Sequence, residues 1–178
     1  QISLAIQNDR LREEMVERER LEREIQVARQ IQKTFLPDHL PDVPGWRIDV
    51  RWQTARQVGG DFYDIFRLKN GKVALVIADV ADKGLPAALY MTVTRTLVRA
   101  LSQNKHTPAQ LLNRINQLLS SESSDSMFVT AVYALLDPET GELSYANAGH
   151  NRPLILRAET GQIEQLPLGG TERIVLPS

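Results

Sequence analysis

The sequence predicts an α+β fold, on the basis of three observations. Residues 1–36 have the composition and periodicity of one long helix, and they contain no glycine or proline. Segments with strand patterns come next, followed by two helical segments and then by further strands. This order favours an antiparallel sheet with its helices grouped together over a doubly wound parallel sheet. The 178 residues are enough for one domain with a sizeable core and an appendage.

The composition excludes several classes of protein. Hydrophobic residues make up 42% and charged residues 24% of the chain, which is ordinary for a globular protein. The net charge of −1 gives no support for bulk electrostatic binding to nucleic acid or to an anionic membrane. The chain has no cysteine, and no apolar run approaches the roughly 18 residues of a membrane helix. We therefore expect a cytoplasmic protein with no nucleic-acid or membrane partner.

The helix predicted for residues 1–36 carries two series of residues that recur every seven positions. The first series is Leu4, Leu11, Arg18, Ile25 and Gln32, and the second is Leu21, Ala28 and Phe35. A helix this long cannot bury one stripe along its whole length against a small domain. The pattern therefore favours a two-stranded parallel coiled coil and a homodimer, with the polar Arg18 and Gln32 as weak positions. The alternative is a solvated helix with a few core contacts near Phe35.

The prolines that begin at Pro37 end the long helix, so residues 37–178 are predicted to form a separate domain. Alternation of apolar and polar side chains predicts a half-buried strand over residues 46–53. Two more strands, residues 61–68 and 72–80, are joined by Asn70-Gly71, the preferred two-residue hairpin turn. The later strands are predicted over residues 127–137, 142–150, 153–157 and 162–167, after a polar loop at residues 120–126.

Two helices are predicted between these groups of strands. The first opens at Gly84-Leu85-Pro86, and the second has Thr107 as its N-cap with Gln110 three residues later. The apolar face of the first helix is predicted from positions that step by four, namely Leu89, Val93, Leu97 and Leu101.

Carboxylates stand at the ends of two of the predicted strands. A strict two-residue turn places Asp64 opposite Ile77, so that Asp64 and Asp79 share one face of the sheet. Asp61 then points to the other face, unless a bulge at Gly59-Gly60 re-aims it. Carboxylates on an apolar face need compensation, which a hard divalent cation supplies. The alternative is that each aspartate caps a turn or pairs with arginine or lysine.

Other candidate residues are weaker. Asp82 follows the second of these strands and is a further possible oxygen donor to a metal. The histidines His39, His106 and His150 have no ligand spacing, so we expect each to be a turn or surface residue. The glycines match neither a P-loop nor a dinucleotide fingerprint.

Five motifs in order carry a resemblance to a known family. They are "ARQIQKTFLPDHLP", "VGGDFYDIF", "VALVIADVADKGLPAALYM", "FVTAVYALLD" and "LSYANAGHNRPLIL". Together they resemble the PPM-type, metal-dependent serine/threonine phosphatases of the bacterial SpoIIE/RsbU-like branch. The first thirty residues also resemble the end of a GAF sensor domain that continues into a linker helix. The resemblance implies an α-β-β-α sandwich of two antiparallel sheets with helix pairs outside.

The resemblance also implies a site. Two Mn²⁺ or Mg²⁺ ions are expected, with Asp61, Asp79 and the backbone carbonyl of Val80 as ligands and Asp64 and Gly60 in support. A metal-activated water would attack a phosphoserine or phosphothreonine of a protein substrate, and in this branch the usual substrate is an anti-sigma-factor antagonist. The alternative function is a catalytically inactive regulatory or dimerisation module.

This chain departs from the family pattern in two ways. The family commonly has Ser-Gly-Lys-Gly where this chain has residues 81–84, Ala-Asp-Lys-Gly. Two further metal-binding aspartates of the family have no counterpart here. We therefore expect the chain to be part of a longer protein and to be inactive alone.

Overall fold

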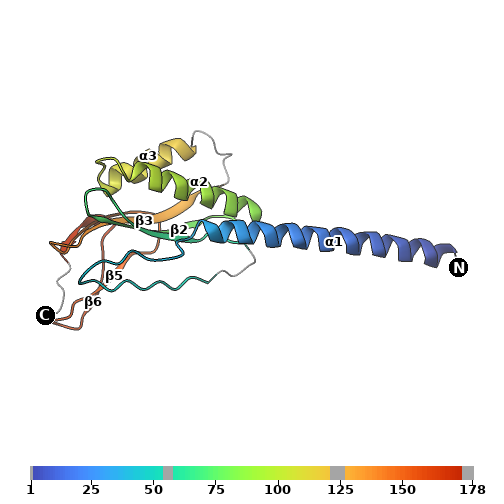
Figure 1. Cartoon of the computed structure of the whole chain (residues 1–178), viewed down its shortest axis with the longest axis horizontal. Coiled ribbons are helices and arrows are strands. Elements are labelled where there is room, and N and C mark those ends of the chain that lie inside the picture. Colours follow the sequence, from blue (N-terminus) through green and yellow to red (C-terminus); the bar gives the residue numbers. More distant parts are fainter. Residues whose placement is uncertain (1, 54–57, 121–126, 174–178) are drawn as a thin grey trace.

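The structure is a computed structural model that describes residues 2–53, 58–120 and 127–173 (Figure 1). Three helices and seven strands follow one another along this part of the chain. They are α1 (Ile2–Thr34), β1 (Phe62–Arg67), β2 (Val73–Val80), α2 (Leu85–Leu101), α3 (Pro108–Ser120), β3 (Val129–Asp137), β4 (Glu142–Ala148), β5 (Leu154–Leu156), β6 (Ile163–Gln165) and β7 (Gly169–Arg173). The predicted mixture of helices and antiparallel sheet is therefore confirmed.

The sheet has helices on one face and extended chain on the other. Five antiparallel strands lie in the order β1-β2-β3-β4-β7, and β5 and β6 form a separate pair. Helices α2 and α3 cover one face, while the chain before β1 and the β5–β6 pair lie on the other side (Figure 1). The main core lies between helices and sheet, with Met91 and Leu111 packed in one cluster with Phe62 and Tyr133. A smaller cluster around Val43 lies on the opposite face.

Helix α1 projects away from the rest of the molecule (Figure 1). Its predicted seam is exposed at Leu21 and Ile25, which are 50% and 37% accessible, and becomes half-buried from Ala28 onward. The side chain of Leu4 lies outside the described ones. Gln32, by contrast, is buried and contacts the globular domain. Its prediction as a weak position of a coiled-coil seam is therefore wrong, because the helix docks on its own domain before that position is reached.

The predicted strand over residues 46–53 is absent, and no strand is assigned there in the described part of the chain. The alternation still describes most of the side chains, because Trp46, Ile48 and Trp52 pack against the core clusters. Val50, on the same predicted face, is 36% exposed. Alternation reports which side chains meet an apolar surface, but not whether the backbone pairs with another strand.

The predicted apolar face of α2 is correct at Leu97 and Leu101, which pack against the main core, but wrong in the first half of the helix. Leu89 is 61% and Val93 is 48% exposed, whereas the buried positions are Ala87, Ala88, Met91, Thr94 and Val98. Steps of four residues advance about 40° past each full turn, so a series of such steps drifts around the helix. Small residues at Ala87 and Ala88 let the helix lie close to the sheet.

Other local predictions are confirmed. The capping box of α3 is present, since the Gln110 N–H donates to Thr107 Oγ1 at 3.3 Å and the Thr107 N–H donates to Gln110 Oε1 at 3.0 Å.

Strand β7 was not predicted, and its Gly169-Gly170 pair lacks the side chains from which a strand is recognised. The loop at residues 121–126 lies outside the described residues. No helix in the described part is long and apolar enough to cross a membrane.

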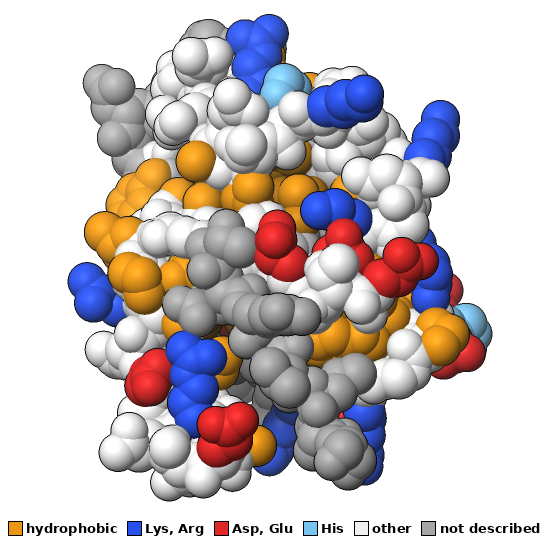
Figure 2. Space-filling view, turned by 90° about the vertical axis from the view of Figure 1, so that its left-hand side faces the viewer, with side chains coloured by type: hydrophobic (Ala, Val, Ile, Leu, Met, Phe, Trp, Pro, Cys, Tyr) orange, Lys and Arg blue, Asp and Glu red, His pale blue; other side chains and the backbone are white. Residues whose placement is uncertain are grey.

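Hydrophobic side chains also reach the surface. Figure 2 shows them grouped beside acidic and basic side chains on the end of the molecule away from the start of α1. On the β5–β6 pair, Leu154, Leu156 and Ile163 are each more than 60% exposed.

Candidate metal centre

The hairpin between β1 and β2 has a different register from the predicted one. The Leu68 N–H donates to Lys72 O at 2.8 Å, which leaves the three residues 69–71 in the loop, with Gly71 at φ 86°. Asp64 therefore pairs with Val76 and not with Ile77. A slip of one residue moves every side chain of a strand to the other face. The prediction that Asp64 and Asp79 share a face is wrong for this reason.

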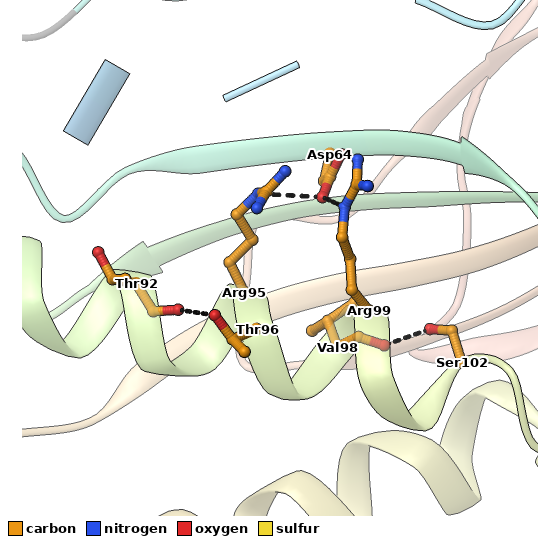
Figure 3. A network of polar contacts seen from close by, with 7 residues as sticks. All are labelled: Asp64, Thr92, Arg95, Thr96, Val98, Arg99 and Ser102. Atoms are coloured by element: carbon orange, nitrogen blue, oxygen red, sulfur yellow. Dashed lines mark hydrogen bonds and ion pairs between the residues drawn. The ribbon is translucent and has the colours of Figure 1, made fainter. Parts of the chain in front are cut away.

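Asp64 instead faces helix α2, where it meets two arginines (Figure 3). Arg99 donates to it twice, from Nε at 2.6 Å and from Nη2 at 2.8 Å. Arg95 Nε lies 3.0 Å from the same carboxylate, but off the direction of a hydrogen bond, so this is a contact of charges. The hydrogen bond to Asp64 raises the pKa of Arg99, while burial lowers the pKa of Arg95. Asp64 is therefore paired with arginine, which was the alternative to a role at a metal site. Its ion pairs join β1 to α2.

Asp61 and Asp79 meet at the other face. The observed register, continued by one residue, places Asp61 opposite Asp79 without any bulge. Burial, a hydrogen bond to Asp79 and the charge of Asp79 raise the pKa of Asp61 from 3.8 to about 6. Two carboxylates that share a proton in this way form a site of concentrated negative charge, which a cation stabilises.

Three contacts fix the loop that carries Asp61. The side-chain amide of Gln32 in α1 binds both backbone polar groups of Gly59. Gly60 lies so close to β2 that an added Cβ would be 2.8 Å from Val80 Cβ and 2.9 Å from Val80 O. The indole N–H of Trp52 donates to the Asp61 carbonyl at 3.2 Å. The sequence analysis did not find the roles of Gln32 and Trp52. The one available signal was Gln32 as a second polar residue, beside Arg18, in a seven-residue series of apolar positions.

Thr130 and His150 extend the site across the sheet. Thr130 pairs with Asp79 between β3 and β2, and its Oγ1 lies 3.4 Å from Asp79 O and 2.9 Å from His150 Nδ1. Burial lowers the pKa of His150, and the charge of Asp79 opposes that change. The backbone of His150 lies in a bend, as predicted, but its side chain is half-buried beside the carboxylates.

The donor set fits a hard divalent cation, although it is small. Asp61 and Asp79 provide carboxylate oxygens, and the Val80 backbone lies against Gly60 next to them. No cluster of three or more acidic, histidine or cysteine side chains suited to a metal occurs among the described residues. Asp82 is exposed and accepts from the Lys83 N–H at 2.7 Å. Its φ of 152° lies in the region that favours glycine, the residue that the family resembled above commonly has there.

Comparisons with known proteins place this chain among relatives of known class. Protein IcfG of Synechocystis sp. is 37% identical over 163 residues, which cover 76% of this chain and 26% of that protein. Phosphoserine phosphatase RsbU of Bacillus subtilis is 32% identical over 127 residues, which cover 71% of this chain and 38% of that protein. The crystal structure of the RsbU and RsbW domains of a Mycobacterium tuberculosis protein superimposes with a TM-score of 0.57 at 27% identity, covering 68% of this chain and 37% of that one.

The chain thus spans well under half the length of these curated relatives. A family model described as Stage II sporulation protein E (SpoIIE) matches residues 69–172, which is more than half of the chain. This match begins before β2 and ends within β7, so it includes Asp79, Thr130 and His150. The chain therefore belongs to the SpoIIE family.

Proposed function

We propose that this chain is part of a metal-dependent protein serine/threonine phosphatase that acts in bacterial signalling. The observation that carries the proposal is the contact between the Asp61 and Asp79 carboxyls. Burial and this contact together raise the pKa of Asp61 to about 6. The similarity to a protein named phosphoserine phosphatase supports the same class of reaction.

Each described residue of the site has a role in this proposal. Asp61, Asp79 and the Val80 carbonyl would hold two Mn²⁺ or Mg²⁺ ions, together with ligands from elsewhere in the protein. Bound metal lowers the pKa of a water molecule, so that hydroxide is available to attack phosphorus near neutral pH. Gln32, Gly60 and Trp52 keep Asp61 in position. Asp64 supports the site indirectly, by fixing α2 on β1.

The substrate and the partners are part of the same proposal. The substrate is a regulatory protein that carries phosphoserine or phosphothreonine, of the anti-sigma-factor-antagonist class. The exposed leucine and isoleucine side chains of α1 support a homodimer through that helix. An upstream sensor domain such as GAF would act through α1, whose last turn already touches the loop of Asp61 through Gln32.

The second candidate function is an inactive regulatory module of the same fold. The observation that favours it is the small donor set among the described residues. In the first candidate function the carboxylates of Asp61 and Asp79 are needed for phosphate hydrolysis, and in the second they are not.

Phosphopeptide hydrolysis by the full-length protein, with Mn²⁺ and with EDTA, separates these functions. We expect activity that EDTA abolishes and that Asp79→Asn lowers by at least about a hundredfold, because the site loses a charged ligand. Asp49→Asn is the matched control, because Asp49 is exposed and pairs with Arg47 away from the site. Full activity in Asp79→Asn would exclude the proposed site, and a wild-type protein without metal-dependent turnover would favour the inactive module.

A further inference from the structure

Four polar side chains lie in a row across one end of the sheet. Asp61 touches Asp79, Asp79 pairs with Thr130 on the neighbouring strand, and Thr130 Oγ1 lies 2.9 Å from His150 Nδ1. Side chains of directly paired residues point to the same face of a sheet, so Thr130 and Asp79 share one face. The row therefore brings an imidazole to within one side chain of the carboxylate pair.

Hydrogen bonds fix both the backbone and the ring of His150. The backbone N–H of His150 donates to Asn147 Oδ1 at 2.8 Å, and Asn147 Nδ2 donates to the backbone carbonyl of His150 at 2.9 Å. Gly149, at φ 73°, forms a bridge with Ala131 next to Thr130. The ring is then oriented by Thr130 at Nδ1. An imidazole that is fixed at its backbone and at one nitrogen is preorganised to present its other nitrogen to a ligand.

The proposed reaction needs a group of this kind. Cleavage of a serine or threonine phosphate ester leaves an alkoxide, which is a poor leaving group unless it receives a proton. In the proposed function Asp61 and Asp79 bind the cation, so neither is available to protonate the leaving group. Along the row, His150 is the remaining side chain, and an imidazole is a general acid that works near neutral pH. Burial lowers the pKa of His150, and the charge of Asp79 opposes this change.

We propose that His150 is a further catalytic residue, which hydrogen-bonds through Nε2 to the oxygen that links phosphorus to the substrate serine or threonine. This inference rests on the proposed phosphatase function. As the hydroxide oxygen forms its bond to phosphorus, the ester P–O bond breaks and its electron pair stays on the side-chain oxygen. That oxygen takes the proton from Nε2, which yields a free hydroxyl, inorganic phosphate and a neutral imidazole that is reprotonated from solvent. Thr130 is a positioning residue that acts through His150.

The test compares two substrates with different leaving groups in the full-length protein with Mn²⁺. A phosphoserine peptide needs protonation of its leaving oxygen, whereas p-nitrophenyl phosphate releases a stable phenolate. We expect His150→Gln to lower kcat on the peptide by about a hundredfold, and to change kcat on p-nitrophenyl phosphate by less than about threefold. Mn²⁺ affinity, measured by calorimetry, should stay unchanged. His39→Gln is the matched control, because His39 is exposed and outside the row.

Two further variants keep the test decisive if His150→Gln does not fold. Thr130→Val removes the hydroxyl that orients the ring, and should lower kcat selectively on the peptide, by about tenfold. Thr130→Ser keeps the hydroxyl and should restore the wild-type ratio of the two substrates. An equal loss on both substrates, an unchanged kcat on the peptide, or a loss that follows weaker Mn²⁺ binding would each overturn the role of His150. A wild-type protein that hydrolyses neither substrate would instead overturn the proposed phosphatase function, and this inference with it.

Discussion

The side-chain amide of Gln32 binds both the N–H and the carbonyl of Gly59, two residues before Asp61. This pair joins the last turn of the projecting helix α1 directly to the loop that carries a proposed metal ligand. The two residues are 27 positions apart in the chain, and Gln32 is 4% exposed. No other element lies between α1 and the loop of Asp61 at this contact.

We predict that Gln32→Leu weakens Mn²⁺ binding by about tenfold, because the loop of Asp61 loses two hydrogen bonds and leaves two backbone groups without their partner. Calorimetric titration of the full-length protein measures this change. Gln30→Leu, on the exposed side of the same helix, is the matched control and should bind Mn²⁺ like the wild type. Equal affinity in the two variants would show that the contact does not position Asp61.

Gly60→Ala is expected to destabilise the domain by about 1–3 kcal/mol and to impair metal binding. The new Cβ would meet the Val80 backbone oxygen at 2.9 Å, so β2 or the loop must move. Urea unfolding gives the stability, and a Mn²⁺ titration gives the affinity. Gly170→Ala is the control, because its nearest neighbour would lie at an ordinary 3.7 Å. Wild-type stability in Gly60→Ala would mean that the approach of these backbones is not tight.

Asp64→Asn should lower the free energy of unfolding by about 3–5 kcal/mol, because it leaves two arginines without their buried counter-charge. Asp64 is fully buried, and Arg95 is 11% exposed at its side chain. Arg99→Lys should cost less, because Arg99 is 42% exposed and lysine keeps the charge. The folded Asp64→Asn protein should still bind Mn²⁺. A selective loss of Mn²⁺ binding without a loss of stability would instead make Asp64 part of the metal site.

The raised pKa of Asp61 makes both stability and metal binding depend on pH. The folded, metal-free protein keeps a proton that the unfolded chain releases, because the pKa is about 6 in place of 3.8. This stabilising contribution is present at low pH and is lost as the pH rises through about 6. A cation must displace the same proton, so Mn²⁺ affinity should rise by about tenfold per pH unit below about 6 and then level off.

Calorimetry at several pH values, in buffers of different ionisation enthalpy, measures this affinity and the released proton together. Asp82→Asn is the control and should keep the same profile, because Asp82 bonds to the neighbouring Lys83 N–H. Affinity that does not change below pH 6 would contradict the shared proton.

Leu21→Glu together with Ile25→Glu should convert a dimer into a monomer, because both residues lie on the exposed seam of α1. Light scattering on the full-length protein gives the mass. Val16→Glu with Val27→Glu is the matched control, since these exposed residues lie off the seam. A dimer that survives the seam variant would place the interface elsewhere, and dissociation of the control would show that charge alone separates the chains.

Local sequence signals by themselves determined most of the elements of this protein. The unbroken helix before Pro37 and the capping box at Thr107 each depend on interactions within a few residues. The resemblance to a family likewise predicts Asp61 and Asp79 as metal ligands from the sequence.

The tertiary structure decided which of these residues meet. The hairpin loop has one residue more than predicted, with Gly71 at positive φ. Because side chains alternate with a period of two, this extra residue places Asp61, and not Asp64, on the same face as Asp79. The docking of α1 brought Gln32 to Gly59, and the pairing of β2 with β3 brought Thr130 and then His150 to Asp79. These contacts join residues far apart in the chain, so their formation depends on how the packed elements are placed and not on any local pattern.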